Sequence, residues 1–197
     1  MKRAVLFFAF AVVVAIVGLI LPYRSNSQQP GGSSNDELVA RGEYLVSVGA
    51  CNDCHSPKVF GPMGPVADTT RRLSGSPANS PIPKAPKNVL APNKWGAITS
   101  NDMTIWQGPW GVSFTRNLTP DTTTGLGSWT PEMFIKTIRT GKHMGEGRNL
   151  LPPMPWPEYA HMTDGDLRAI FAYLRTLKPI QNAVHDPIPT AAAPGTK

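Results

Sequence analysis

The sequence is poor in the residues on which metal clusters, disulfide frameworks and strongly charged surfaces depend. It holds two cysteines among 197 residues, and only 16% of its residues are charged. One cysteine pair cannot supply the four ligands of a structural zinc site without a second Cys or His pair at close spacing. Of 19 lysines and arginines, Lys2, Arg3 and Arg24 precede every acidic residue, which leaves 16 bases against 13 acids. So small an excess of positive charge does not favour nucleic acid as a partner.

Proline and glycine, by contrast, are plentiful, with 21 and 18 residues. Nine of the prolines lie between residues 57 and 110, where neither a helical nor a strand-like hydrophobic period is sustained. We therefore expect long ordered loops, and within residues 58–113 an irregular structure with short helical turns.

Residues 1–21 are predicted to be an export signal. Two basic residues precede an uncharged apolar run over residues 4–21, which as a helix would be about 27 Å long. That length approaches the hydrocarbon thickness of a bilayer and no Ala-x-Ala site follows, so an uncleaved transmembrane anchor is favoured. Cleavage within residues 22–35, a polar stretch predicted to be a flexible linker, is the alternative. Either way, the remaining chain is expected on the periplasmic side of the cytoplasmic membrane.

Three later segments carry signals for helices. Their predicted limits are Asn35 to the cysteines, Thr130 (N-cap) to Gly141 (stop), and Thr163 (N-cap) to the residue before Pro179. We expect one domain over residues 36–186, followed by a disordered tail over residues 187–197.

The two cysteines have the spacing of a c-type haem attachment site. Cys51 and Cys54 are separated by two residues and followed at once by His55. Each thiol can add to one haem vinyl group, and the imidazole then lies over the iron. A thioredoxin-like pair would follow a strand, whereas here a helix precedes it. A disulfide across four residues would close too small a loop to stabilise the fold much. The motif therefore predicts one covalently bound haem c with His55 as an iron ligand.

The second axial ligand of the iron must be another Met or His. Met154 is the favoured candidate because four prolines stiffen the loop that surrounds it, over residues 150–157, between two predicted helices. A thioether is a weak donor, so placing it before the bond forms reduces the entropy lost. Met133 and Met162 are interpreted as packing. The remaining candidates are Met144 and His143 as the main rivals, then His161, His185, Met63 and Met103.

Other side chains are candidates for contacts with the porphyrin. Trp156 and Trp110 could pack on it or donate to a propionate, although filling a loop core is an equally good interpretation. Arg148 and Asn117 are candidate propionate ligands. A proline carbonyl, of Pro62 or Pro65, is the expected acceptor for the outer nitrogen of the axial histidine.

Several motifs, together with the Cys-x-x-Cys-His site, resemble a bacterial class I cytochrome c domain. More narrowly, they are similar to the cytochrome subunits that accept electrons in membrane dehydrogenases. The resemblance covers residues 38–182 and rests on Asn-Leu-Thr-Pro-Asp at 117–121, Thr-Gly-Leu-Gly-Ser-Trp-Thr at 124–130, Arg-Thr-Gly-Lys-His at 139–143 and Pro-Pro-Met-Pro-Trp at 152–156. It implies an all-α fold, His55/Met154 ligation, and packing of Gly42 and Leu45 against the last helix.

The predicted function is electron transfer without catalysis, because iron bound by Met and His has no open position. The expected partners are a membrane dehydrogenase, a respiratory complex or a terminal oxidase. A free carrier and an obligate dehydrogenase subunit both fit, and a peroxidase or gas sensor is the competing class. Six bases within residues 56–100 face one acid, Asp68, and could steer an acidic redox partner or simply be a solvated loop. They are Lys58, Arg71, Arg72, Lys84, Lys87 and Lys94.

Overall fold

The computed structural model describes residues 34–91 and 93–190. The predicted signal segment over residues 1–21, nearly all of the predicted linker and the end of the predicted tail lie outside these ranges. Among the described residues, no helix combines the length and the apolar character needed to cross a lipid bilayer.

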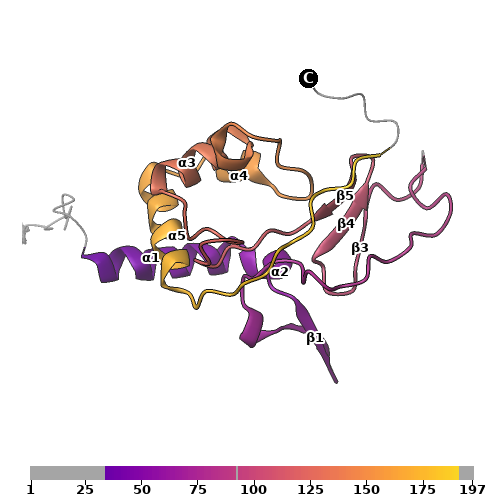
Figure 1. The fold of residues 1–197 in the computed structure, drawn as a ribbon, viewed down its shortest axis with the longest axis horizontal. Helices are drawn as coiled ribbons and strands as arrows, with labels where there is room; N and C mark the ends of the chain where they lie inside the picture. The colour runs from indigo at the N-terminus through magenta and orange to yellow at the C-terminus, as the bar shows by residue number, and fades with distance from the viewer. Residues whose placement is uncertain (1–33, 92, 191–197) are drawn as a thin grey trace, which may run out of the picture. The chain divides into compact units, whose positions relative to one another are not determined.

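Three helices form at the places that the capping signals indicate (Figure 1). Helix α1 (Asn35–Val48) begins with a capping box, in which Ser34 and Glu37 bond each other's backbone N–H groups. Helix α3 (Pro131–Thr140) has Thr130 as its N-cap and ends at Gly141 with a φ of 64°. Helix α5 (Asp164–Thr176) is capped by Thr163. The first cap precedes the predicted Asn35 by one residue, and the other two N-caps are confirmed.

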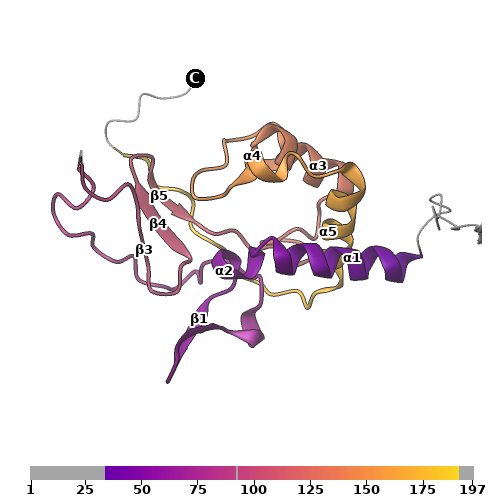
Figure 2. The same ribbon diagram turned by 180° about the vertical axis from the view of Figure 1, so that it is seen from behind.

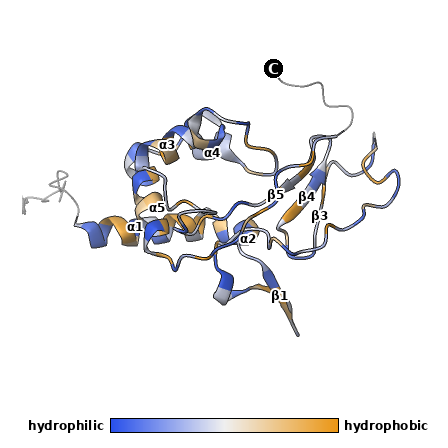
Figure 3. Cartoon of the chain, in the orientation of Figure 1, coloured by the Kyte–Doolittle hydropathy of each residue, from blue (hydrophilic) through white to orange (hydrophobic). Residues whose placement is uncertain are grey.

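The core lies where α1, α3 and α5 meet. Figure 3 shows hydrophobic residues along α1 and α5, after a hydrophilic first turn of α1. Gly42 of α1 lies so close to Ala169 and Tyr173 of α5 that a Cβ atom would collide with the Ala169 carbonyl. The implied packing of Gly42 against the last helix is thus present. Buried side chains from outside the three helices also join this core, namely Leu73 and Leu126.

The described residues also form four shorter helices. They are α2 (Cys51–His55), the 3-10 turns η1 (Thr69–Arg71) and η2 (His143–Gly145), and α4 (Trp156–Tyr159).

The prediction of an all-α fold is wrong, because two antiparallel sheets lie within residues 58–114. Strands β1 (Lys58–Gly61) and β2 (Gly64–Ala67) form one hairpin. Strands β3 (Ile98–Thr99), β4 (Ile105–Gly108) and β5 (Gly111–Phe114) form a three-stranded sheet. Two to four residues are too few to show a strand period, which explains the error. A usable signal was present in the paired glycines, Gly61 with Gly64 and Gly108 with Gly111, that bound each two-residue turn.

The chain after α5 returns across the molecule to the three-stranded sheet, as Figures 1 and 2 show from opposite sides. There Ile188 exchanges two backbone hydrogen bonds with Val112, with N···O distances of 2.7 and 2.9 Å. Ordered structure therefore extends past residue 187, where the tail was predicted to begin.

Candidate functional site

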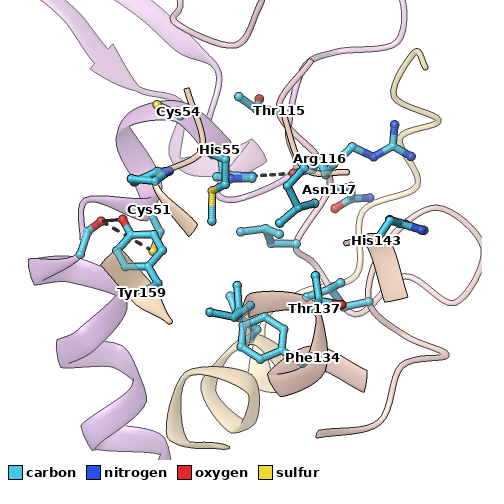
Figure 4. Close-up of a pocket in the computed structure, with 18 of the residues that line it drawn as sticks. Cys51, Cys54, His55, Thr115, Arg116, Asn117, Phe134, Thr137, His143 and Tyr159 are labelled. Atoms are coloured by element: carbon cyan, nitrogen blue, oxygen red, sulfur yellow. Dashed lines mark hydrogen bonds between the residues drawn. The ribbon is translucent and has the colours of Figure 1, made fainter. Parts of the chain in front are cut away.

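One mostly apolar cavity brings together residues from the helices α1 to α5 and from strands β4 and β5 (Figure 4). Cys51, Cys54 and His55 lie along one wall. Phe134 and Thr137 of α3 face them across the cavity. Since α3 and α5 present their buried faces to the same space, the core continues directly into the cavity lining.

The backbone turn between α1 and α2 places both cysteines at the cavity. Ala50 has a left-handed φ of 53°, which ends α1 and starts the one-turn helix α2. Both thiols are free. Burial raises the pKa of Cys51 to about 11, and burial with the nearby Asp53 carboxylate raises the pKa of Cys54. Redox-active dithiols need a thiol with a lowered pKa, so these values argue against a thioredoxin-like pair.

His55 is held by one hydrogen bond that leaves its other ring nitrogen available. Its Nδ1–H donates to the Arg116 carbonyl oxygen over 2.8 Å. Burial lowers the pKa of this histidine, which keeps the imidazole neutral, the form that binds a metal. The predicted acceptor, a carbonyl of Pro62 or Pro65, is wrong. Those prolines lie in the β1–β2 hairpin, none of whose residues lines the cavity.

Met154 lines the same cavity, partly buried against the core. Two hydrogen bonds hold its loop. Within the loop, the Met154 N–H donates to the Leu151 carbonyl over 3.3 Å, and from strand β5, Ser113 Oγ–H donates to the Pro152 carbonyl over 2.7 Å.

Two rivals of Met154 also line the cavity, His143 and Met162. The sequence favoured packing for Met162, and its place in the lining was missed. Other described candidates stand outside the lining: Met63, Met103, Met133, Met144, His161 and His185.

Positive charge gathers at one part of the cavity lining. Arg116 and Arg148 both contribute to it, beside His143. Burial and the mutual repulsion of the charges lower the pKa of Arg148, and burial lowers the pKa of Arg116. Asp186, mostly exposed, is the acid that faces Arg116, at 3.8 Å. The Arg116 guanidinium also donates to the carbonyls of Val184 and His185, over 3.3 and 3.2 Å. Two cationic residues in an otherwise apolar lining suit an anionic group in the cavity. Arg116 was missed by the sequence reasoning, although it directly precedes the Asn-Leu-Thr-Pro-Asp motif.

Asn117 lines the cavity, but its side-chain amide already makes hydrogen bonds within the protein. Its amide nitrogen donates to Thr124 Oγ1 and the Ile180 carbonyl, and its oxygen accepts from Thr119. The residue therefore ties the loop after β5 to the chain after α5.

The two predicted tryptophans are not among the described residues that line the cavity. The ring of Trp156 packs on Gly141. The indole N–H of Trp110 donates to Ser113 Oγ over 3.3 Å. Two other tryptophans, Trp106 and Trp129, line the cavity. Tyr159 also lines it beside Cys51 and donates its hydroxyl to the Gly49 carbonyl over 2.6 Å. Sequence reasoning missed this residue.

The residues fit a c-type haem site. Two free thiols, a neutral imidazole with one unused nitrogen and two thioethers share one apolar cavity, whose lining also includes two arginines. This set of donors matches what an iron porphyrin with carboxylate substituents requires.

Comparison with known proteins supports the same class, although no family model matches the chain. The chain is 31% identical over 173 residues to the gluconate 2-dehydrogenase cytochrome c subunit of Pantoea cypripedii, covering 87% of this chain and 31% of that protein. It is 28% identical over 156 residues to the cytochrome c subunit of alcohol dehydrogenase (quinone) from Gluconobacter oxydans, covering 78% and 25%. Over a shorter stretch of 73 residues it is 38% identical to the fructose dehydrogenase cytochrome subunit of Gluconobacter japonicus, covering 36% and 15%.

The chain thus spans about a third or less of the length of these relatives. The resemblance to cytochrome c subunits of dehydrogenases is confirmed. Relatives of this kind support electron transfer by a cytochrome c, and they imply a c-type haem.

Proposed function

We propose that this chain carries one haem c, bound through Cys51 and Cys54 with His55 and Met154 as iron ligands, and relays single electrons. The observation that carries the proposal is the meeting of these four side chains in one apolar cavity. When bound, the haem supplies a metal centre that exchanges one electron.

The protein's own residues bind, orient and shield this centre. The Arg116 carbonyl fixes the orientation of the His55 ring. The loop around Met154 is set in advance by the bonds to Leu151 and Ser113, which reduces the entropy lost on ligation. Arg116 and Arg148 are the proposed partners of the haem propionates, since both are cationic residues of the cavity lining. Apolar side chains such as Phe134 exclude water.

The ligand assignment is tested with two matched variants. Met154→Ala removes the proposed ligand, whereas Met162→Ala removes a second methionine from the same lining. Both proteins should keep haem after denaturation and acid-acetone extraction. Only Met154→Ala should lose the charge-transfer band of thioether-bound ferric iron. If Met162→Ala loses the band instead, the ligands are misassigned, and if the wild type releases its haem, covalent attachment is disproved.

A haem carrier with both axial positions filled should resist external ligands. We therefore expect cyanide and carbon monoxide to bind the native protein slowly and weakly. Rapid, tight binding would favour a peroxidase or a gas sensor.

We further propose that the electron donor is a dehydrogenase, because the relatives are cytochrome subunits of gluconate, alcohol and fructose dehydrogenases. The site of action is the periplasmic side of the cytoplasmic membrane, a proposal that rests on the export signal expected in residues 1–21. The acceptor would be a respiratory complex or a terminal oxidase.

The basic surface available to such partners is smaller than the sequence suggests. Lys58 Nζ donates to the carbonyls of Asn52, Asp53 and Ser56, so it caps α2. Arg72 donates to Asn52 and lies over the Tyr173 ring. The bases left to steer a partner are Arg71, Lys84, Lys87 and Lys94.

The donor is identified with membranes from cells that produce the protein. Gluconate, ethanol and fructose are each added while the reduction of the haem is followed. One substrate should reduce the haem quickly in membranes that contain this chain. This haem reduction should disappear in membranes from cells in which the gene for this chain is deleted. If none of these oxidisable substrates reduces the haem faster than buffer does, a donor of the kind found in the relatives is excluded.

A further inference from the structure

One short piece of the region over residues 58–113 is buried beside the haem motif. Residues 73–76 are all buried, and they belong to a segment over residues 72–78 that we call the strap. On one side, the Leu73 N–H donates to Ser56 Oγ over 2.9 Å, and the Gly75 N–H donates to the His55 carbonyl over 2.7 Å. On the other side, the Ser76 N–H donates to the Thr115 carbonyl over 2.9 Å. The strap therefore joins the haem-binding helix to the chain that supplies the Arg116 carbonyl.

Asn182 closes the strap from outside. Its amide nitrogen donates to the Ser74 and Ser76 carbonyls over 2.7 and 2.8 Å, and its oxygen accepts from the Ala78 N–H over 2.9 Å. Asn182 is 4% exposed and is not part of the cavity lining. The Asn182 side chain therefore acts on the site through the strap, while its backbone N–H separately donates to Thr124 Oγ1 over 2.9 Å, a bond that Asn182→Ala leaves in place.

Gly75 lies against the Arg116 carbonyl. Its φ of +77° favours glycine. A Cβ atom there would lie 2.5 Å from the Thr115 carbonyl oxygen and 2.6 and 2.7 Å from the carbon and oxygen of the Arg116 carbonyl. This carbonyl is the one that accepts from His55. Any side chain at residue 75 must displace it.

We propose that Gly75 is a positioning residue, which keeps the Arg116 carbonyl against His55 Nδ1 and thereby sets the strength of His55 as an iron ligand. The inference rests on the proposed haem site. A carbonyl that accepts from Nδ1–H fixes the ring and raises the basicity of the other nitrogen. A more basic ligand favours the ferric state. Displacing the carbonyl should consequently raise the midpoint potential.

The test compares Gly75→Ala with Gly64→Ala in the full-length haem protein. Gly64 also has a positive φ, +109°, but its Cβ would meet nothing within 4 Å. Both variants therefore strain the backbone, and only Gly75→Ala pushes on the Arg116 carbonyl. We expect Gly75→Ala to raise the midpoint potential and to speed hydrogen exchange of the His55 Nδ1 proton, while Gly64→Ala leaves both unchanged.

A second pair of variants covers the case in which Gly75→Ala does not fold. Asn182→Ala releases the strap without adding bulk, and it should raise the potential by a smaller amount. Ser76→Ala removes a buried hydroxyl that has no hydrogen-bond partner among the described residues, and it should change nothing.

The outcomes separate this inference from the proposed function. Haem content and the thioether band report on the haem site itself. If these are retained and the potential of Gly75→Ala matches that of Gly64→Ala, the positioning role is overturned and the haem site stands. If Gly75→Ala does not fold, an unchanged potential in Asn182→Ala overturns it equally.

Discussion

Two regions of the molecule differ in how much apolar surface they bury. One is the helical region, residues 34–55 and 131–176, and the other is the region over residues 58–113. In the helical region, faces of α1, α3 and α5 bury a continuous apolar cluster. The three-stranded sheet has only a small cluster of its own, formed by Ile105, Phe114 and Val184. Since burial of apolar surface dominates stability, the helical region should carry most of it.

Within residues 58–113, the burial of side chains differs from one segment to the next. The β1–β2 hairpin leaves Phe60 and Met63 62% and 98% exposed. Leu73 of the strap is fully buried and joins the core of the helical region. In this region the strap reaches the core and Trp106 and Ser113 line the cavity, whereas the hairpin adds exposed surface.

The largest expected effect comes from truncating one buried leucine in each region, which tests whether the strap belongs to the core. Leu174→Ala in α5 and Leu73→Ala in the strap each remove a side chain that is at most 2% exposed. Each should lower the free energy of unfolding by about 2–5 kcal/mol, because a cavity adds to the lost transfer energy. Denaturant unfolding followed by circular dichroism measures both. A cost for Leu73→Ala below about 1 kcal/mol would place the strap outside the core.

Helix caps should show an intermediate effect confined to the helical region. Thr163 Oγ1 accepts from the Asp166 N–H over 3.1 Å at the start of α5. Thr163→Ala should cost about 1 kcal/mol. Thr163→Ser keeps the acceptor and is the control, expected to be nearly neutral in the same unfolding experiment. Equal losses in both variants would contradict a capping role.

The exposed hairpin should be nearly indifferent to substitution. Phe60→Ser and Met63→Ser should each change the free energy of unfolding by less than about 0.5 kcal/mol, because these side chains bury little surface. The double variant should behave as the sum. A loss of several kcal/mol would show that the hairpin packs on something in the folded protein, and the contrast with the strap would fail.

The smallest effect concerns acid stability, and it should be alike for Asp68 in the second region and Asp121 in the loop before α3. Hydrogen bonds from Thr70 lower the pKa of Asp68, and hydrogen bonds from Thr124 lower the pKa of Asp121. The unfolded value is about 3.9, so each carboxylate stabilises the fold above that pH, and the contribution is lost as the pH falls below it. Asp68→Asn and Asp121→Asn should each flatten the fall in stability between about pH 5 and pH 3. Unfolding curves at stepped pH that keep the wild-type slope would contradict this.

The sequence alone was sufficient where the signal is local. Thr130, Pro131 and Gly141 mark the two ends of α3 because caps depend on neighbouring residues. The spacing of Cys51, Cys54 and His55 is a local signal too, because attachment of haem needs a fixed separation along the chain, and the haem site stays a prediction. The strands of residues 58–114 were missed because their pairing partners, not their own two to four residues, define them.

Whatever depends on residues far apart in the chain was settled by the tertiary structure. The acceptor for His55 lies 61 residues away, at Arg116, where no local pattern points. Likewise, only folding separates Met154, Met162 and His143, which line the cavity, from the other Met and His candidates. Chemical identity and short spacing are written in the chain, whereas the choice among equivalent donors is made by packing, which alone decides which of them face the same space.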